Sequence, residues 1–197
     1  MKLDIKIPET LNDLTLLQWQ KIMAIGEDVE PLFYIKRILS IVYNIKAEFN
    51  SIKESDIELL TDAVRSLLVQ KPVFKNRFTL DGIEYGFIPN LEKISFGEFI
   101  DLDKYTERED YNKLMSILFR PIIKSQVGDR YKIEKYGGSY DFNMIPLGIA
   151  LGAVTFFLTL GEQLTAATLN SLTEGEVQQA KRLILAKNGG GIPASTI

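Results

Sequence analysis

Apolar and polar residues alternate at the start of the chain and then give way to helical spacing. The alternation has a period of two over residues 3–7, which predicts a half-buried strand that ends at Pro8. Thr15 and Gln18 follow with the spacing of a capping box, in which each side chain bonds the other residue's backbone N–H. We therefore expect the first clear helix to begin at Thr15.

Two further helices are indicated before residue 75. Apolar side chains recur three and four residues apart after Pro31, forming a stripe wide enough to face a core. Ser55 and Glu58 have capping-box spacing and precede a second stripe of the same kind. Because proline cannot continue a helix, we expect this helix to stop at Pro72.

The pattern changes to strands over residues 78–87. Asp81-Gly82 lies between alternating apolar residues, and this dipeptide is the strongest short-range signal for a β-hairpin because its turn needs positive φ at both positions. A two-residue turn at this point sets the register of the hairpin. Two pairs should face each other: Leu80 with Ile83, and Phe78 with Tyr85.

The second half of the chain carries four more helical patterns, separated by a loop or short strand around Tyr131 and Ile133. Ser95 and Glu98 form another capping box. A helix should also end just ahead of Pro121, because the residue before a proline disfavours helical geometry. The expected helices cover about 95–104, 111–119, 144–161 and 173–187.

The long uncharged stretch at 144–161 requires a decision between a buried helix and a membrane span. It is shorter than the about 20 apolar residues that a span needs, contains Pro146 and lacks a belt of Lys or Arg on either flank. We expect an apolar core helix. Gly148 and Gly152 are spaced so that another helix can approach closely, within this chain or from a neighbouring subunit.

Two stretches of the chain share a pattern. Residues 5–20 and 85–100 both contain Ile-Pro, a leucine, a capping box and then an aromatic residue, which is Trp19 in one and Phe99 in the other. The similarity resumes further on, so that residues 5–45 correspond to residues 85–122. This pattern favours a tandem strand–helix–helix duplication, in which Trp19 and Phe99 would be buried at equivalent places. The alternative is that strand-to-helix junctions commonly share a proline and a capping box.

Composition narrows the class of protein. The chain has 197 residues, is 46% hydrophobic and 25% charged, and lacks both cysteine and histidine. These values are ordinary for a globular protein. No disulfide, thiolate nucleophile, His-containing metal site or Ser-His-Asp triad can form without those two residue types. The net charge of −3 gives no general attraction to nucleic acid or to an anionic membrane, and no secretory leader is evident.

Candidate chemistry is sparse. No phosphate-binding glycine loop and no nucleophile elbow occurs. Acidic residues crowd positions 98–110, and Asp101 and Asp103 could hold a divalent cation, but Lys104 and Arg108 are interleaved with them and favour a solvated helix face. We therefore expect no enzymatic activity, no catalytic or metal site and no cofactor.

Two glycine-flanked segments are candidates for partner contacts. The loop at 125–141 combines basic residues with tyrosines, a composition that suits a protein interface or a nucleic-acid strand, and the overall acidity favours protein. The loop and the tail at 188–197 both have little apolar area of their own, so we expect both to be ordered by contact with another chain. The predicted contact residues are Tyr131, Tyr136, Tyr140, Ile192, Pro193 and Ile197.

Three strings together resemble a known group of proteins: IPNLEKISFGEFIDLD, SILFRPI and GDRYKIEKY, the last followed by the apolar helix. Roughly residues 75–160 are similar to small proteins encoded among the virion and morphogenesis genes of tailed phages of Bacteroidetes, including crAss-like phages. The resemblance carries no catalytic residues. It implies a virion structural component, such as a ring or cargo protein of the portal or tail, or else a tail assembly chaperone.

We expect a predominantly helical α+β protein with tandem strand–helix–helix repeats, a small antiparallel hairpin and an apolar C-terminal helix. Residues 1–187 should form one compact domain, followed by the docked tail. The leading functional hypothesis is a non-enzymatic, multi-copy phage virion protein of the portal or tail, assembled in the bacterial cytoplasm. Its partners would be other virion proteins and its own copies, with no specific nucleic acid and no membrane. The alternative is a tail assembly chaperone absent from the mature virion.

Overall fold

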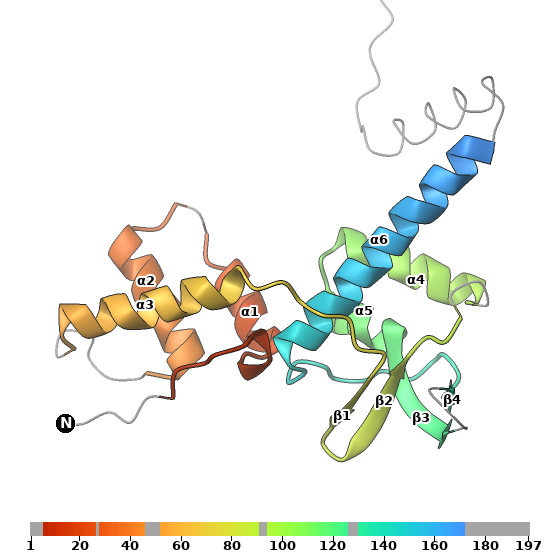
Figure 1. The fold of residues 1–197 in the computed structure, drawn as a ribbon, viewed down its shortest axis with the longest axis horizontal. Coiled ribbons are helices and arrows are strands. Elements are labelled where there is room, and N and C mark those ends of the chain that lie inside the picture. The colour runs from red at the N-terminus through yellow and green to blue at the C-terminus, as the bar shows by residue number, and fades with distance from the viewer. Residues whose placement is uncertain (1–5, 27, 46–51, 91–93, 126–129, 172–197) are drawn as a thin grey trace, which may run out of the picture. The chain divides into compact units, whose positions relative to one another are not determined.

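The structure is a computed structural model that describes residues 6–26, 28–45, 52–90, 94–125 and 130–171. The fold is α+β and about half helical, with six α-helices and one four-stranded antiparallel sheet in the described residues (Figure 1). The chain divides into two compact units at Thr155/Phe156, and each is described separately. The elements are η1 (Leu11–Asp13, a 3-10 turn), α1 (Leu16–Met23), α2 (Pro31–Tyr43), α3 (Glu54–Leu68), β1 (Arg77–Leu80), β2 (Ile83–Phe87), α4 (Phe96–Glu107), α5 (Tyr111–Leu118), β3 (Phe119–Ser125), β4 (Tyr131–Ile133) and α6 (Leu147–Ser171).

Two of the three predicted capping boxes are confirmed. Thr15 caps α1 by accepting a hydrogen bond from the Gln18 backbone N–H, and Gln18 returns the contact. Ser95 and Glu98 do the same for α4. The third prediction is wrong, because α3 already begins at Glu54, so that Ser55 lies inside its first turn. Acidic residues in that first turn, where the helix dipole favours negative charge, make an earlier start favourable.

The predicted hairpin is confirmed in type and register. Asp81 and Gly82 both have positive φ, of 50° and 78°, as the two central residues of a type I′ turn require. β1 and β2 pair with Leu80 opposite Ile83 and Phe78 opposite Tyr85. This hairpin forms one side of the sheet, whose strand order is β1-β2-β3-β4.

The sequence analysis missed β3. This strand follows α5 without a connecting turn, because Phe119 at the end of the helix already has an extended backbone, and it runs through Pro121 to pair with β2 and β4. Of the two alternatives expected around Tyr131, a loop or a short strand, the structure has the strand, β4. The strand expected over residues 3–7 is wrong for residues 6 and 7, which have no regular structure, and residues 3–5 lie outside the described part.

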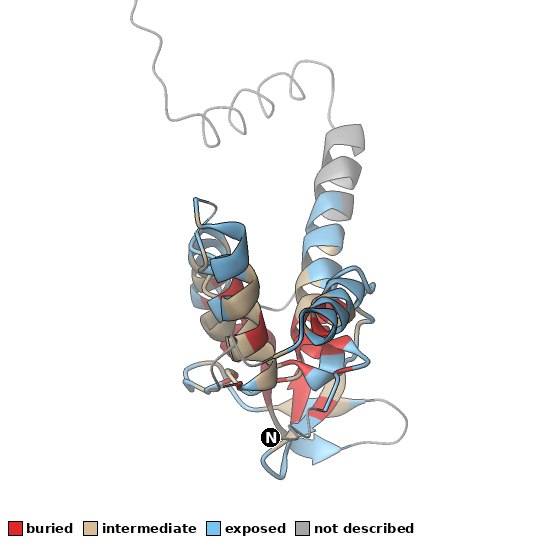
Figure 2. Ribbon diagram, turned by 90° about the vertical axis from the view of Figure 1, so that its left-hand side faces the viewer, coloured by how far each residue is buried: buried red, intermediate tan, exposed pale blue. Residues whose placement is uncertain are grey.

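The core of the first unit holds two hydrophobic clusters and an aromatic layer on the sheet. Figure 2 shows where the buried residues lie along the ribbon, in red. Leu11 and Leu14 pack with Leu67 of α3 and Leu147 of α6 in one cluster. The second cluster joins α2 and α3 through Leu39 and Leu60. The aromatic layer consists of buried rings in edge-on or stacked contact, namely Phe78, Tyr85, Phe87, Phe119 and Phe142.

The first turns of α6 belong to this core and accept close neighbours at both glycines. A Cβ atom on Gly148 would lie 2.6 Å from Asn12 Oδ1 of η1, and one on Gly152 would lie 2.6 Å from the backbone oxygen of Val73. The predicted close approach is therefore made within the chain, although to a 3-10 turn and an extended segment instead of another helix. No helix among the described residues is both long and apolar enough to cross a membrane.

Two predictions concern residues whose structure is not described. The helix predicted at 173–187 and the tail at 188–197 lie outside the described residues.

Trp19 is half-buried against the ring of Tyr111, whereas Phe99 is 57% exposed, so the expectation that both are buried at equivalent places is wrong for Phe99. A single domain over residues 1–187 stays a prediction.

Candidate functional site

A buried ion pair joins the start of α4 to the central strand β3. The Arg120 Nη2 atom lies 2.7 Å from Glu98 Oε1, and both side chains are only 7% exposed. The other carboxylate oxygen of Glu98 accepts a 2.6 Å hydrogen bond from the Ser95 backbone N–H. The capping box therefore fixes the carboxylate, and the carboxylate in turn positions the guanidinium. Arg120 Nε is buried without a hydrogen-bond partner in the structure.

The segment from Glu134 to Asp141 is attached to α4 and α5 by side-chain hydrogen bonds. The Tyr136 hydroxyl donates to Asp101 of α4, and Lys113 Nζ of α5 lies 3.1 Å from Ser139 Oγ. Asn112 Nδ2 donates to Asp141 Oδ1 at 3.1 Å. This segment is therefore ordered by contacts within the chain. The sequence-based argument that an outside surface must order it is wrong for these residues.

Two tyrosine hydroxyls in this segment face carboxylates. Tyr140 donates to Glu134, and its pKa is raised to about 12, first by burial and then by that hydrogen bond. Burial and the hydrogen bond to Asp101 likewise raise the pKa of Tyr136. Because the phenols stay protonated far above neutral pH, they act here as hydrogen-bond donors and have no role as bases.

Tyr131 attaches β4 to the hairpin. Its hydroxyl lies 2.7 Å from the Phe87 carbonyl oxygen and 3.1 Å from that of Asn76, and the Arg77 guanidinium lies 4.6 Å from the ring centroid. The ring covers Gly86 so closely that any Cβ at that position would overlap it. The fourth strand is thus held by one aromatic ring as well as by its backbone pairing with β3.

The three predicted contact tyrosines therefore have different surroundings. Tyr131 packs on the hairpin, Tyr136 binds α4, and Tyr140 binds Glu134 beside the ring of Tyr85. All three are half-buried, and each retains some exposed surface. Ile192, Pro193 and Ile197 lie outside the described residues. Contact of these six residues with a neighbouring chain stays a prediction.

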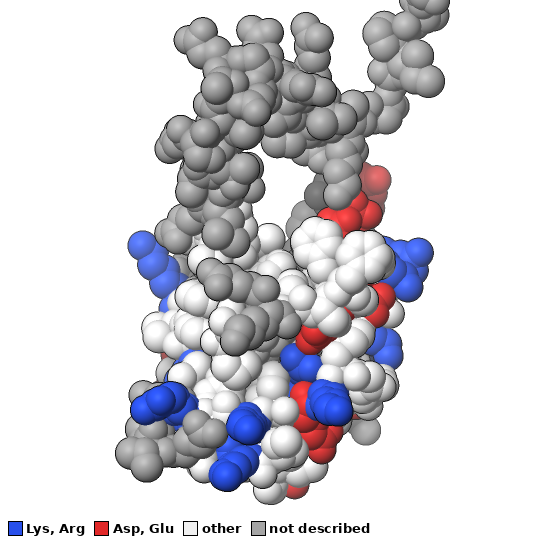
Figure 3. Space-filling model, turned by 90° about the vertical axis from the view of Figure 1, so that its right-hand side faces the viewer, with Lys and Arg blue, Asp and Glu red and all other residues white. Residues whose placement is uncertain are grey.

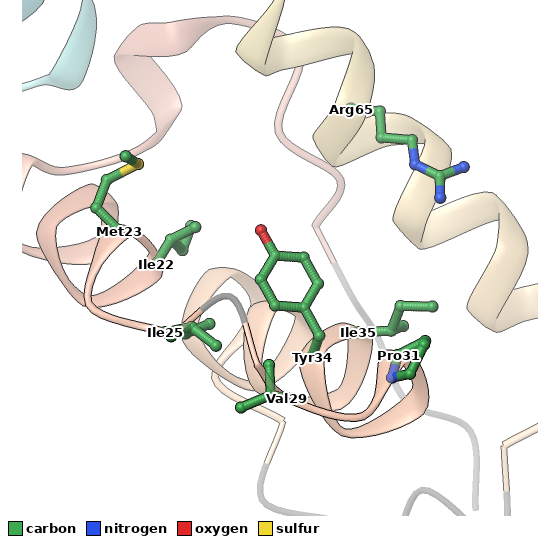
Figure 4. Close-up of a pocket in the computed structure, with 9 residues that line it drawn as sticks. Ile22, Met23, Ile25, Val29, Pro31, Tyr34, Ile35 and Arg65 are labelled. Carbon is green, nitrogen blue, oxygen red and sulfur yellow. The ribbon is translucent and has the colours of Figure 1, made fainter.

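A hollow of about 560 Å³ lies beside the connection between α1 and α2 (Figure 4). Most of its lining side chains are apolar, and the Tyr34 hydroxyl and the Arg65 guanidinium are polar groups among them. The remaining lining residues are Ile22, Met23, Ile25, Gly26, Val29, Pro31 and Ile35. A cavity of this size and character suits apolar side chains of a ligand or partner.

A second hollow of about 640 Å³ shares part of the same connection. It shares Ile25, Gly26 and Val29 with the first hollow, and it adds the cations Lys21 and Arg37 beside Phe33. The sequence analysis missed both hollows because their walls come from a loop and two helix ends. Met23, which is 64% exposed, was no signal in the sequence because it follows Trp19 and Ile22 with the spacing of one helical stripe.

The acidic residues at 98–110 make contacts with other groups of the chain. In the part of the chain that the structure describes, no group of three or more His, Cys, Asp and Glu side chains is arranged to hold a metal ion. Asp101 is instead engaged with Tyr136, and Asp110 caps α5 by accepting from the Lys113 backbone N–H at 3.1 Å. These acids thus have structural contacts of their own.

Comparisons with protein-family models, with curated proteins and with solved structures find no match to this chain.

Proposed function

We propose that this protein is a non-enzymatic structural component of a tailed-phage virion, present in several copies in the portal or tail as a ring or cargo protein. It acts through protein–protein contacts, is assembled in the bacterial cytoplasm and is carried in the finished particle. The setting comes from the sequence resemblance over residues 75–160. The observation that carries the contact role is the apolar surface on α1 and α2.

This α1–α2 surface is defined by the two hollows and the apolar side chains around them. Met23, Phe33 and Tyr34 are all exposed although they line a hollow. Exposed apolar area costs about 25 cal/mol for each Å² that a partner could cover, so a contiguous patch of this kind favours association. Arg37 and Lys21 beside the second hollow would orient an acidic partner without adding much affinity.

The experiment that tests the role is quantitative mass spectrometry of purified virions from the phage that encodes the protein. The proposal expects a fixed copy number in every particle. Absence from particles, combined with presence in lysates during assembly, would replace it with the tail assembly chaperone.

Incorporation of variants tests the α1–α2 surface directly. Met23→Glu and Phe33→Glu should each lower the copy number in particles, because each places a charge in the apolar contact. Val69→Glu is the matched control, since Val69 is also an exposed apolar residue but lies at the end of α3. Equal incorporation of all three variants would remove the α1–α2 surface from the proposal.

We further propose that residues 5–45 and 85–122 are tandem repeats and that the chain closes with an apolar helix. The formed capping boxes at Thr15 and Ser95, each followed by two helices, support the repeat. The low charge of α6, with Glu162 as its single charged residue, supports the closing helix.

A further inference from the structure

A basic ribbon lies at the far end of β3 and β4. Lys124 is the cross-strand partner of Lys132, and the exposed cations Arg130 and Lys135 flank β4. Like charges directly opposite each other destabilise a strand pair. Among the residues that the structure describes, neither Lys124 nor Lys132 takes part in an ion pair. The basic ribbon therefore carries a repulsion that an acidic surface would relieve.

The same ribbon exposes a large apolar side chain. Ile123 is 62% exposed and is the extra residue of a β-bulge in β3, because Ile122 pairs with Ile133 and Lys124 with Lys132, so that Ile123 and Lys124 together oppose Lys132. The basic ribbon thus combines one exposed isoleucine with four cations. A partner surface with both apolar and acidic groups would complement it. Figure 3 shows Lys and Arg side chains gathered on the lower part of the face that it presents.

An exposed stripe on α4 has this composition. With about 100° per residue in a helix, five residues fall within one face. The first three are apolar, with Phe96 78% exposed and Ile100 47% exposed, and the last two are acidic. The α4 stripe consists of Phe96, Phe99, Ile100, Asp103 and Glu107.

The cations of α4 do not lie on this stripe. Lys104 and Arg108 project from a neighbouring face by the same helical spacing, and Lys104 Nζ lies 5.0 Å from the centre of the Tyr105 ring. The α4 stripe is therefore apolar at its start and acidic at its end. Its opposite face is fixed in the core through Glu98 and Leu102.

We propose that the α4 stripe of one copy docks on the basic ribbon of the next copy. Phe96, Phe99 and Ile100 would cover Ile123, and Asp103 and Glu107 would face Lys124 and Lys132. Because two different surfaces meet, the contact is heterologous, and repeating it builds a ring or an open filament. This proposal deepens the proposed function and rests on it, because it supplies the contact between copies of a multi-copy component.

Charge reversal tests the contact. Lys124→Glu/Lys132→Glu and Asp103→Lys/Glu107→Lys should each weaken self-association of the full chain by about 100-fold, because like charges then face each other. Sedimentation velocity over a dilution series measures this, and thermal melts confirm that each variant folds. The matched control, Lys71→Glu/Lys75→Glu, reverses two exposed lysines outside the ribbon and should associate as the wild type does.

Mixing the two variants gives the decisive outcome. Each variant alone carries two surfaces of like charge, whereas alternating copies of the two carry opposite charges at every contact. The mixture should therefore associate when neither variant does. A wild-type chain that stays monomeric, a self-association unchanged by the reversals, or a mixture that stays dissociated would overturn the inference.

A nucleic-acid role for the basic ribbon is tested in the same samples. If the wild type stays monomeric and binds a DNA duplex that Lys124→Glu/Lys132→Glu does not bind, the ribbon recognises phosphates and the inference is overturned. None of these results affects the virion measurement, which tests the proposed function separately.

Discussion

Replacing Glu98 by Gln should destabilise the protein by about 3–5 kcal/mol, because it removes one partner of a buried ion pair. Arg120 would keep its charge at a site where its side chain is 7% exposed, and its Nε atom already lacks a partner. Glutamine at this position can still close the capping box with Ser95. The helix cap therefore stays in place, and the drop in the free energy of unfolding measures the cost of leaving the buried Arg120 charge without its partner.

A double-mutant cycle with Arg120→Met separates the interaction energy of the Glu98–Arg120 pair from the other effects of the two substitutions. Arg120→Met alone leaves the Glu98 carboxylate buried, with the Ser95 N–H as its remaining donor, and should also cost about 3 kcal/mol. The double variant Glu98→Gln/Arg120→Met buries no charge and should lie within about 1 kcal/mol of the wild type. The coupling energy expected from these values is at least about 5 kcal/mol.

Urea unfolding followed by Trp19 fluorescence measures these differences, since Trp19 is the single tryptophan and packs 4.8 Å from the Tyr111 ring. Asp62→Asn is the control, because the pair of Asp62 with Arg65 is 72% exposed on both sides and should contribute less than about 1 kcal/mol. Single variants that cost no more than this control, or a double variant equal to the sum of both, would refute the reasoning.

Two further predictions concern a glycine and a phenol. Gly152→Ala should lower the free energy of unfolding in the same urea assay by about 1–3 kcal/mol, because its Cβ would lie 2.6 Å from the Val73 backbone oxygen. The control Gly97→Ala lies in open space on α4 and should raise the free energy of unfolding by about 0.5 kcal/mol. Equal effects of the two substitutions would contradict the close packing of α6. Tyr140 has a folded-state pKa raised to about 12 from 10.0, so its contribution to stability is complete below pH 10 and is lost as the pH rises through 12. Tyr140→Phe should therefore remove a phenol whose ultraviolet titration falls near pH 12, and loss of a phenol titrating near pH 10 would contradict the contact with Glu134.

Local signals in the sequence predicted much of the fold where one turn or cap decides the structure. The caps at Thr15 and Ser95 and the Asp81-Gly82 turn each depend on residues within three positions, and all three formed as predicted. β3 was missed because its sequence, FRPIIKS, does not alternate between apolar and polar residues and contains a proline, which usually argues against a strand paired on both sides. Its first residue, Phe119, continued the pattern of α5.

The candidate site was less predictable because its contacts join distant positions. The tyrosines of the segment after β4 were visible, but Tyr136 binds Asp101, 35 residues away, and Tyr131 binds Phe87, 44 residues away. No periodicity reports such pairs. The same holds for Glu98, whose capping role was evident from Ser95 while its ion pair with Arg120 was not.

The contact of Tyr131 with Gly86 makes two positions of the chain interdependent. The ring occupies the space that a side chain at residue 86 would need, and its hydroxyl reaches past that residue to the Phe87 carbonyl. A larger residue at 86 can be accommodated only if residue 131 becomes smaller, and β4 then loses both a ring contact and a hydrogen bond. Among related chains, the two positions should therefore covary, with glycine at 86 wherever an aromatic residue stands at 131.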